Sequence, residues 1–322
     1  MPGSGGPAIS SLDGRGSLGS YRHFRLFDYC GTNTGTKVWG GEGGVGMSLG
    51  IVFKGPEGIV LAADSRVTLN AKVDPPGQPS MLLPATFDNA TKLLKVQGQD
   101  FVGAITYGLG AIGLKAPRTA HSFMPEFEAE LGTKKRLSVE DFAKRLGTFF
   151  MARWTELGMP DPKDWKFEPM IFLVGGYDEG QPYGRAFELN VPTQPNPTET
   201  MAGEGVFGAL WGGQRSYVDR LMQGFDEQAL MIVGQHLGLA PDKYNELRTV
   251  VKAQCGVKIP YQFLPLQDCV DLTIFLIRTT ISIQTWVVDI RGVGGAIDVA
   301  TITKTDGFRR IQSKTILGER ET

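Results

Sequence analysis

The sequence predicts an α+β fold in which two stacked, mainly antiparallel sheets carry helices on their outer faces. Three observations lead to this prediction. Two β-rich runs near residue 50 are joined by a turn signal, and a pair of helical segments follows later in the chain. Strand runs then return before and after a further helix. This order suits sheets that bury one face against each other and the other face against helices.

The clearest element is a hairpin. Leu49–Lys54 and Ile59–Ala63 are rich in β-branched and apolar residues, and they flank the turn-forming run GPEG at 55–58. The second strand delivers an Asp-Ser-Arg run, residues 64–66, as it leaves the sheet. Because antiparallel partners put the start of one strand beside the end of the next, we expect Ser48 to lie close to this run.

The remaining elements follow in chain order. Strands are predicted at 92–96, 101–107, 170–175, 185–189, 296–303 and 308–312, with one more running to about residue 203, and helices at 114–131, 138–157 and 266–288. Ser138 is an N-cap residue followed by acids in the first helical turn. Residues 75–84 are predicted to form a Pro-rich loop, and 214–264 a largely helical insertion with a helix at 217–237.

Composition excludes several classes of function. The 322 residues carry a formal net charge of -1, which gives no basis for a nucleic-acid partner. No apolar run reaches membrane-spanning length, so no membrane partner is expected. The first 20 residues lack the apolar core of a secretory signal, and three cysteines without a CxxC pair give no disulfide framework. A reduced, cytoplasmic location is the simplest interpretation.

Residues 1–47 differ from the rest of the chain. They are rich in Gly and Ser, and the run GGEGGVG at 40–46 has almost no side chains with which to pack. We therefore expect a flexible arm, followed by one domain over 48–322. The arm ends directly before Met47 and Ser48, so it is either a propeptide or an untranslated extension with Met47 as the true start.

The run SLGIVFKGPEGIVLAADSR (48–66) resembles the N-terminus of mature proteasome β-type subunits, which are N-terminal-nucleophile hydrolases, and the chain looks like a divergent, prokaryotic-like member. Counting back from Asp64 without a gap puts the family's nucleophile position on Ser48. The likeness continues at NATKLLK (89–95), where Lys92 takes the position of the family's active-site lysine. It covers roughly residues 48–210 and 266–312. The fold it implies is a four-layer αββα sandwich.

The resemblance also implies roles for other residues. Gly108, at the end of GAITYG (103–108), takes the position of an oxyanion-hole amide, and Asp289 opens the acid-plus-glycine loop DIRGVGG. Around the specificity pocket it places Val67, Ala90, Leu94, Thr106, Gly110 and Leu114. None of these pocket residues is charged, which indicates a neutral or apolar substrate side chain.

These residue types suit amide hydrolysis. A chain-terminal Ser48 would attack through its hydroxyl, and its α-amine, with an ordinary pKa of about 7.7–8.0, would accept the proton. Lys92 would lower the pKa of the hydroxyl, Asp64 would orient the lysine, and Arg66 would pair with carboxylates of the same network. The Gly108 N–H would stabilise the oxyanion, and Asp289 would orient the amine. The chemistry needs no metal and no cofactor.

Two departures from the family pattern bear on this chemistry. A family serine near the amine lies in a Gly-x-Gly element, which is assigned here to Gly203-Glu-Gly205, so that Glu204 would favour the protonated amine. A second family serine is replaced within Arg291-Gly-Val293. The site is thus altered around its periphery, whereas Ser48, Asp64 and Lys92 are retained.

Other enzyme classes fit poorly. GLGAIG (108–113) and GEGVFG (203–208) match the GxGxxG dinucleotide pattern, but antiparallel hairpins stand where a parallel βαβ unit is required. No HExxH, GxSxG or paired Cys/His spacing occurs. Two alternatives assign no catalytic role to these residues. Ser48 would be an ordinary loop serine, and Asp64 and Arg66 would form an ion pair that only closes the hairpin.

The predicted function is a threonine-protease-like peptidase that acts on polypeptides with Ser48 as its nucleophile. The family's assembly into rings implies a homo-oligomer, and its frequent partner is an ATP-dependent unfoldase. Two alternatives stay open. One is a catalytically silent structural subunit with residues 1–47 still attached. The other is an amidohydrolase or transpeptidase for a dedicated substrate.

Overall fold

A computed structural model describes residues 38–39, 48–73, 81–132, 135–288 and 291–318. Most of the predicted flexible arm over 1–47, including its glycine run, lies outside these residues. Within the arm, Val38–Trp39 form the short strand β1, which pairs antiparallel with β4 (Val67–Val73).

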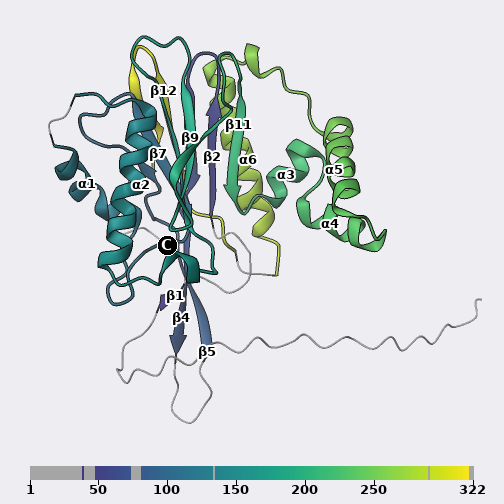
Figure 1. Cartoon of the computed structure of the whole chain (residues 1–322), viewed down its shortest axis with the longest axis horizontal. Helices are drawn as coiled ribbons and strands as arrows, with labels where there is room; N and C mark the ends of the chain where they lie inside the picture. Colours follow the sequence, from purple (N-terminus) through teal and green to yellow (C-terminus); the bar gives the residue numbers. More distant parts are fainter. Residues whose placement is uncertain (1–37, 40–47, 74–80, 133–134, 289–290, 319–322) are drawn as a thin grey trace, which may run out of the picture. The chain divides into compact units, whose positions relative to one another are not determined.

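The strands of the described residues form three sheets (Figure 1). One five-stranded sheet has the order β11 (Gly208–Gly213), β2 (Leu49–Lys54), β3 (Ile59–Asp64), β12 (Ile297–Thr303) and β13 (Gly307–Gln312). The other has the order β10 (Gln194–Thr200), β9 (Arg185–Val191), β8 (Met170–Gly176), β7 (Val102–Gly108) and β6 (Leu93–Leu94). The third is β1, β4 and β5 (Met81–Phe87). Every strand pair of the described residues is antiparallel, so the predicted α+β class is confirmed.

Helices cover both five-stranded sheets. In Figure 1, α1 (Met124–Leu131) and α2 (Val139–Glu156) lie beside the sheet that contains β7 and β9. The helices α6 (Leu266–Gln284) and α3 (Ser216–Gln223) lie beside β2 and β11, with α4 (Glu227–His236) and α5 (Pro241–Cys255) beyond them. Short 3-10 turns occur at Ala120–Phe123, Pro162–Asp164 and Tyr261–Phe263.

Three buried apolar clusters hold these elements together. The first joins α1 and α2 to the β7–β9 sheet, and the second joins α3 and α6 to the β2–β3–β12 sheet. The third contains residues of both five-stranded sheets, including Leu61, Ile105 and Leu173. Strand alternation sorts the side chains: Ile51 belongs to the helix-facing cluster, whereas its neighbour Val52 belongs to the cluster shared by the sheets.

Three predicted helices are shorter than expected, and the one predicted at 266–288 is α6, which ends at Gln284. The helix predicted at 114–131 begins only at Ala120, because the residue before Pro117 is disfavoured in the helical region. The helix predicted at 217–237 is two helices, α3 and α4. Gly224 ends the first with a left-handed φ of 82°, and Asp226 caps the second by accepting the Ala229 N–H at 2.9 Å. In contrast, Ser138 caps α2 as predicted, accepting the Asp141 N–H at 3.0 Å.

Four of the described strands were not predicted from the sequence: β1, β4, β5 and β11. The Pro-rich loop predicted at 75–84 is wrong over 81–84, which belong to β5; residues 74–80 lie outside the described ranges. β11 was missed because three of its six residues are glycine, a residue with low strand propensity. Its pairing with β2 brings Gly213 beside the start of the hairpin.

Within the described ranges, none of the helices combines the length and the apolar character that crossing a membrane requires.

Candidate active site

The hairpin places Ser48 and Asp64 at one end of the β2–β3 pair. Gly50 pairs with Ala63, so the residue before β2 lies beside the end of β3. Lys92 directly precedes β6 and reaches the same place from the other five-stranded sheet. Three distant segments therefore converge on one point because two sheets meet there.

Lys92 joins the other two residues. Its Nζ donates to Ser48 Oγ at 2.8 Å and to Asp64 Oδ1 at 2.6 Å. The side chains of Lys92 and Asp64 are 5% and 0% exposed, and Ser48 is 4% exposed. An ammonium and a carboxylate this deeply buried interact much more strongly than a surface pair does, because solvent screens them less.

Asp64 is held by backbone donors. Its Oδ1 also accepts the Leu49 N–H at 3.0 Å, and its Oδ2 accepts the N–H groups of Arg66 at 3.1 Å and Gly294 at 2.9 Å. Such donors fix the orientation of the carboxylate. Asp64 can therefore position the Lys92 ammonium precisely beside the Ser48 hydroxyl.

Burial lowers the pKa of Lys92 from its ordinary value, and the neighbouring charges of Lys314 and Arg66 act in the same direction. The Asp64 carboxylate opposes this shift by Coulombic attraction and by its hydrogen bond. A lysine with a lowered pKa and a hydrogen bond to a hydroxyl can both stabilise the alkoxide and exchange a proton with it.

Arg66 does not close the hairpin with Asp64. Its guanidinium forms two hydrogen bonds to Asp88, from Nε to Oδ1 at 2.6 Å and from Nη2 to Oδ2 at 2.8 Å. Its Nη1 donates to the Arg291 carbonyl at 3.2 Å. Asp88 was not among the predicted site residues, although it lies only four positions before Lys92. The expectation that Arg66 pairs with a carboxylate of this region is met by a partner that the sequence did not identify.

The glycine element assigned to the Ser48 amine was wrong. The carbonyl oxygens of Met201 and Gly203 accept hydrogen bonds from Lys54 Nζ, at 2.9 and 3.2 Å. Lys54 ends β2, six residues from Ser48 and hence about 20 Å away along an extended strand. Glu204 therefore lies at the opposite end of the strand from Ser48. The element beside Ser48 is Gly213-Gln214, because the Gln214 N–H donates to the Ser48 carbonyl at 2.7 Å.

A small cavity of about 20 Å³ opens beside Ser48. Four of the predicted pocket residues line it together with Ser48, Lys92 and Gly108: Val67, Ala90, Thr106 and Gly110. Thr106 Oγ1 is buried and has no hydrogen-bond partner among the described residues. A cavity of this size holds roughly one water-sized group.

Two predicted pocket residues lie elsewhere. Leu94 is 1% exposed and belongs to the cluster under α1 and α2, because alternation on β6 turns it away from Leu93, which packs between the sheets. Leu114 is 42% exposed and does not line the cavity. Asp289 lies outside the described residues.

Gly108 ends β7 at the wall of the cavity. A Cβ at this position would lie 2.2 Å from the Pro169 carbonyl oxygen, so only glycine fits. The half-buried Glu168 lies against the same spot, and burial raises the pKa of its carboxyl.

Sequence reasoning also missed a second polar group beside the site. Lys314 pairs with Asp298 and donates to Ser65 Oγ at 3.3 Å. Lys314 follows the last strand and Asp298 sits in β12, so no local motif signals their approach to Ser65.

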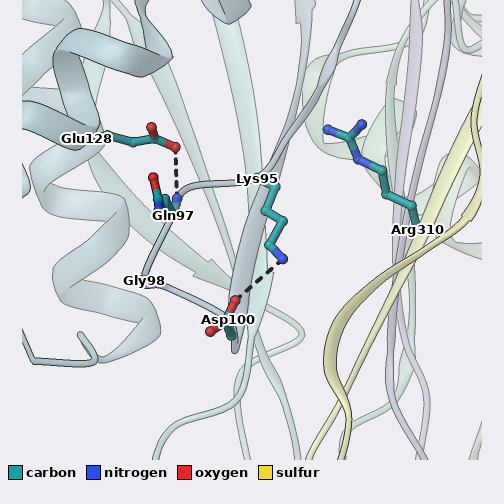
Figure 2. A pocket seen from close by; sticks show the side chains of 6 residues that line it. All are labelled: Lys95, Gln97, Gly98, Asp100, Glu128 and Arg310. Atoms are coloured by element: carbon teal, nitrogen blue, oxygen red, sulfur yellow. Dashed lines mark hydrogen bonds and ion pairs between the residues drawn. The ribbon is translucent and has the colours of Figure 1, made fainter.

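A separate depression of about 390 Å³ lies away from these residues (Figure 2). It is lined by Lys95, Gln97, Gly98, Asp100, Glu128 and Arg310. Lys95 pairs with Asp100 at 3.4 Å, and Glu128 accepts the Gln97 N–H at 2.8 Å. The depression contains none of the predicted site residues.

Comparisons with known proteins leave the family open. No family model matches the sequence, and no curated protein matches it. Among solved structures the chain is similar to one described as an Anbu (Gly-1) mutant from Hyphomicrobium sp. strain MC1. The sequence identity is 13% and the TM-score 0.45, over 83% of this chain and 88% of that chain. A likeness at this level carries no argument about function.

Proposed function

We propose that this chain is a proteasome-β-like N-terminal-nucleophile hydrolase that cleaves peptide bonds with Ser48. One observation carries the proposal: buried Lys92 bridges the Ser48 hydroxyl and the Asp64 carboxylate. A structural ion pair needs no hydroxyl beside it, and burying an ion pair adds little net stability. The three residue types instead match the needs of an activated nucleophile.

The arrangement of the elements supports the same proposal. One apolar cluster is shared by two antiparallel sheets, and each sheet carries a helix cluster on its other face. This is the order expected of a four-layer αββα sandwich. In such a fold the start of β2 and the segment before β6 meet at one edge, where Ser48 and Lys92 lie.

The proposed reaction has two stages. Ser48 Oγ adds to the peptide carbonyl carbon while its proton passes to a base, which is the α-amine of Ser48 once the preceding residues are absent. The adduct collapses with cleavage of the C–N bond, and the leaving amine takes the proton. Water then hydrolyses the acyl ester and restores the hydroxyl. The Lys92 ammonium and the Gly108 N–H would stabilise the developing negative charge.

The cavity sets the proposed substrate class. Val67, Ala90 and Gly110 leave room only for a small side chain before the cleaved bond. The unpartnered Thr106 hydroxyl adds a hydrogen-bonding group at the same wall. We therefore propose small neutral side chains, such as Ala or Ser, at this subsite.

Oligomeric assembly is part of the proposal. Helix α4 exposes Met231, Ile232 and Val233, which are 45–56% exposed. Exposed apolar side chains can contribute to a contact surface. A homo-oligomeric ring, with or without an ATP-dependent unfoldase, would bury such surfaces.

The first test is the intact mass and N-terminal sequence of protein expressed from Met1, with a parallel expression from Met47. Each product is then treated with a serine-reactive fluorophosphonate, and the labelled residue is mapped. A chain that begins at Ser48, is labelled there and cleaves peptides supports the proposal. A chain that still carries residues 1–47, with no labelling or activity in the protein expressed from Met47, supports a silent structural subunit instead.

A further inference from the structure

The segment after the last strand returns to the site through Lys314. The Lys314 N–H donates to Asp298 Oδ1 at 3.0 Å, and its Nζ pairs with Asp298 Oδ2. The same Nζ donates to Ser65 Oγ at 3.3 Å. The side chains of Lys314 and Asp298 are 13% and 5% exposed, and Ser65 is fully buried. This is a buried polar group and not a solvated surface pair.

Ser65 connects this group to the candidate active site. It directly follows Asp64, its N–H donates to the Gly294 carbonyl at 3.0 Å, and its carbonyl accepts the Ala90 N–H at 2.9 Å. Gly294 in turn donates to Asp64 Oδ2, and Ala90 lines the cavity beside Ser48. A shift of Ser65 would therefore move both the carboxylate that holds Lys92 and one wall of the cavity.

Lys314 also places a positive charge near Lys92. The charged groups that act on Lys92 are Asp64, which raises its pKa, and Lys314 and Arg66, which lower it. Asp88 is paired with Arg66, and the positive charge of Lys92 also lowers the pKa of Asp88. Lys314 thus supplies a second positive charge near Lys92, on a segment that the chemistry of Ser48 does not otherwise need.

We infer that Lys314 is a positioning residue for the Ser48–Lys92–Asp64 cluster, acting through Ser65 and through its charge. This inference rests on the proposed function for its effect on catalysis, but not for its effect on Lys92. The segment after β13 is then part of the working site.

The expected direction follows from electrostatics. Removing the Lys314 charge makes protonation of Lys92 easier and raises its pKa. Because the proposed reaction uses Lys92 as an ammonium, loss of its proton limits the rate at high pH, and the falling limb of the kcat/KM profile moves to higher pH.

The main variant is Lys314→Gln, which keeps hydrogen-bond donors for Ser65 and Asp298 but removes the charge. Lys314→Arg keeps the charge and should restore wild-type behaviour. Lys304→Gln is the matched control: Lys304 is exposed in the turn between β12 and β13, and the change in net charge is identical. Ser65→Ala removes only the hydrogen bond, so it should lower kcat without moving the pH limb.

The measurements are the pH profile of kcat/KM on a peptide and the pKa of Lys92 by NMR of protein with ¹³Cε-labelled lysine. In Lys314→Gln the falling limb of the kcat/KM profile and the Lys92 pKa should both shift upward, because one neighbouring positive charge is removed. An unshifted Lys92 pKa in Lys314→Gln, or an equal shift in Lys304→Gln, overturns the inference. If Lys314→Gln does not fold, an unchanged kcat in Ser65→Ala overturns it. Absence of peptide cleavage in every protein, with the Lys92 shift present, rejects the proposed function and leaves the electrostatic inference standing.

Discussion

Arg66 clamps Asp88 through two parallel hydrogen bonds, from Nε at 2.6 Å and from Nη2 at 2.8 Å. The clamp ties the end of the β2–β3 hairpin to the segment that leads into Lys92. It thereby fixes the distance between Asp64 and Lys92 from outside, without contributing a group to the reaction itself. The pair lowers the pKa of Asp88 and raises that of Arg66, chiefly by hydrogen bonding.

This clamp gives a prediction on the pH dependence of stability. The lowered pKa of Asp88 means that its ionised form stabilises the fold above the unfolded pKa of about 3.9, and that this contribution is lost as pH falls through the folded pKa. Asp88→Asn should therefore be less stable than wild type in urea unfolding at pH 7. The difference should shrink toward pH 3. A difference that is constant over this range would show that the charge of Asp88 does not stabilise the clamp.

The two central residues should separate activity from stability. Ser48→Ala should reduce peptide cleavage by at least about 10³-fold while leaving the urea midpoint nearly unchanged, because a small side chain loses one hydroxyl. Lys92→Met should abolish activity and also cost about 3–5 kcal/mol, since it leaves the Asp64 carboxylate buried without its partner.

The double variant Lys92→Met/Asp64→Asn checks this account of stability. It removes the charge left behind and should recover part of the lost stability without recovering activity. Cleavage by Ser48→Ala at the wild-type rate would reject Ser48 as the nucleophile. An unaltered urea midpoint in Lys92→Met would show that Asp64 does not depend on the lysine.

The central cluster was predictable because its signals are local. Two strands joined by a short turn must bring Ser48 and Asp64 to one end, and the hairpin appears with almost the predicted bounds. Lys92, in contrast, reaches the site across the sheet interface, and only the family resemblance indicated it. No sequence pattern indicated that Lys314 and Asp298 approach Ser65, because this approach depends on how the last strands pack.

Glycine patterns explain the main error. Gly203-Glu-Gly205 and Gly212-Gly-Gln214 both offer a glycine-containing turn, and sequence alone gives no reason to prefer the second. What distinguishes them is β11, which pairs Gly213 with Leu49. The strand propensities of its residues did not predict β11. The strand is held by its pairing with β2, and its glycines make room for Tyr107, whose Oη would lie 2.0 Å from a Cβ at Gly212.

Gly213 should consequently be much less replaceable than Gly205. Both have a positive φ, 89° and 69°, which costs an alanine roughly 1–2 kcal/mol. A Cβ at Gly213 would also lie 1.9 Å from the Ser48 carbonyl oxygen, whereas nothing lies within 4 Å of one at Gly205. Gly213→Ala should lose most of its activity and well over 2 kcal/mol of stability.

Gly205→Ala is the matched control, because it carries the backbone strain alone. It should lose about 1 kcal/mol and keep its activity. Equal effects of the two substitutions, measured by urea unfolding and peptide cleavage, would restore the assignment of Gly203-Glu-Gly205 to the Ser48 amine.

The cavity makes the last prediction, which concerns substrate choice. Val67 lines the cavity directly and would contact a Cβ at Gly110 at 3.0 Å, so Val67→Ala should enlarge the space beside Ser48. Each methylene that a pocket accommodates or rejects changes kcat/KM by roughly 10–200-fold. Peptides with Val or Leu before the cleaved bond should therefore gain about tenfold over peptides with Ala when Val67 is shortened. Leu114→Ala serves as control, because Leu114 is 42% exposed and lies outside the cavity.

Two results would place the specificity pocket elsewhere. One is a wild-type enzyme that already prefers Leu before the cleaved bond. The other is a Leu114→Ala enzyme whose preference changes as much as that of Val67→Ala.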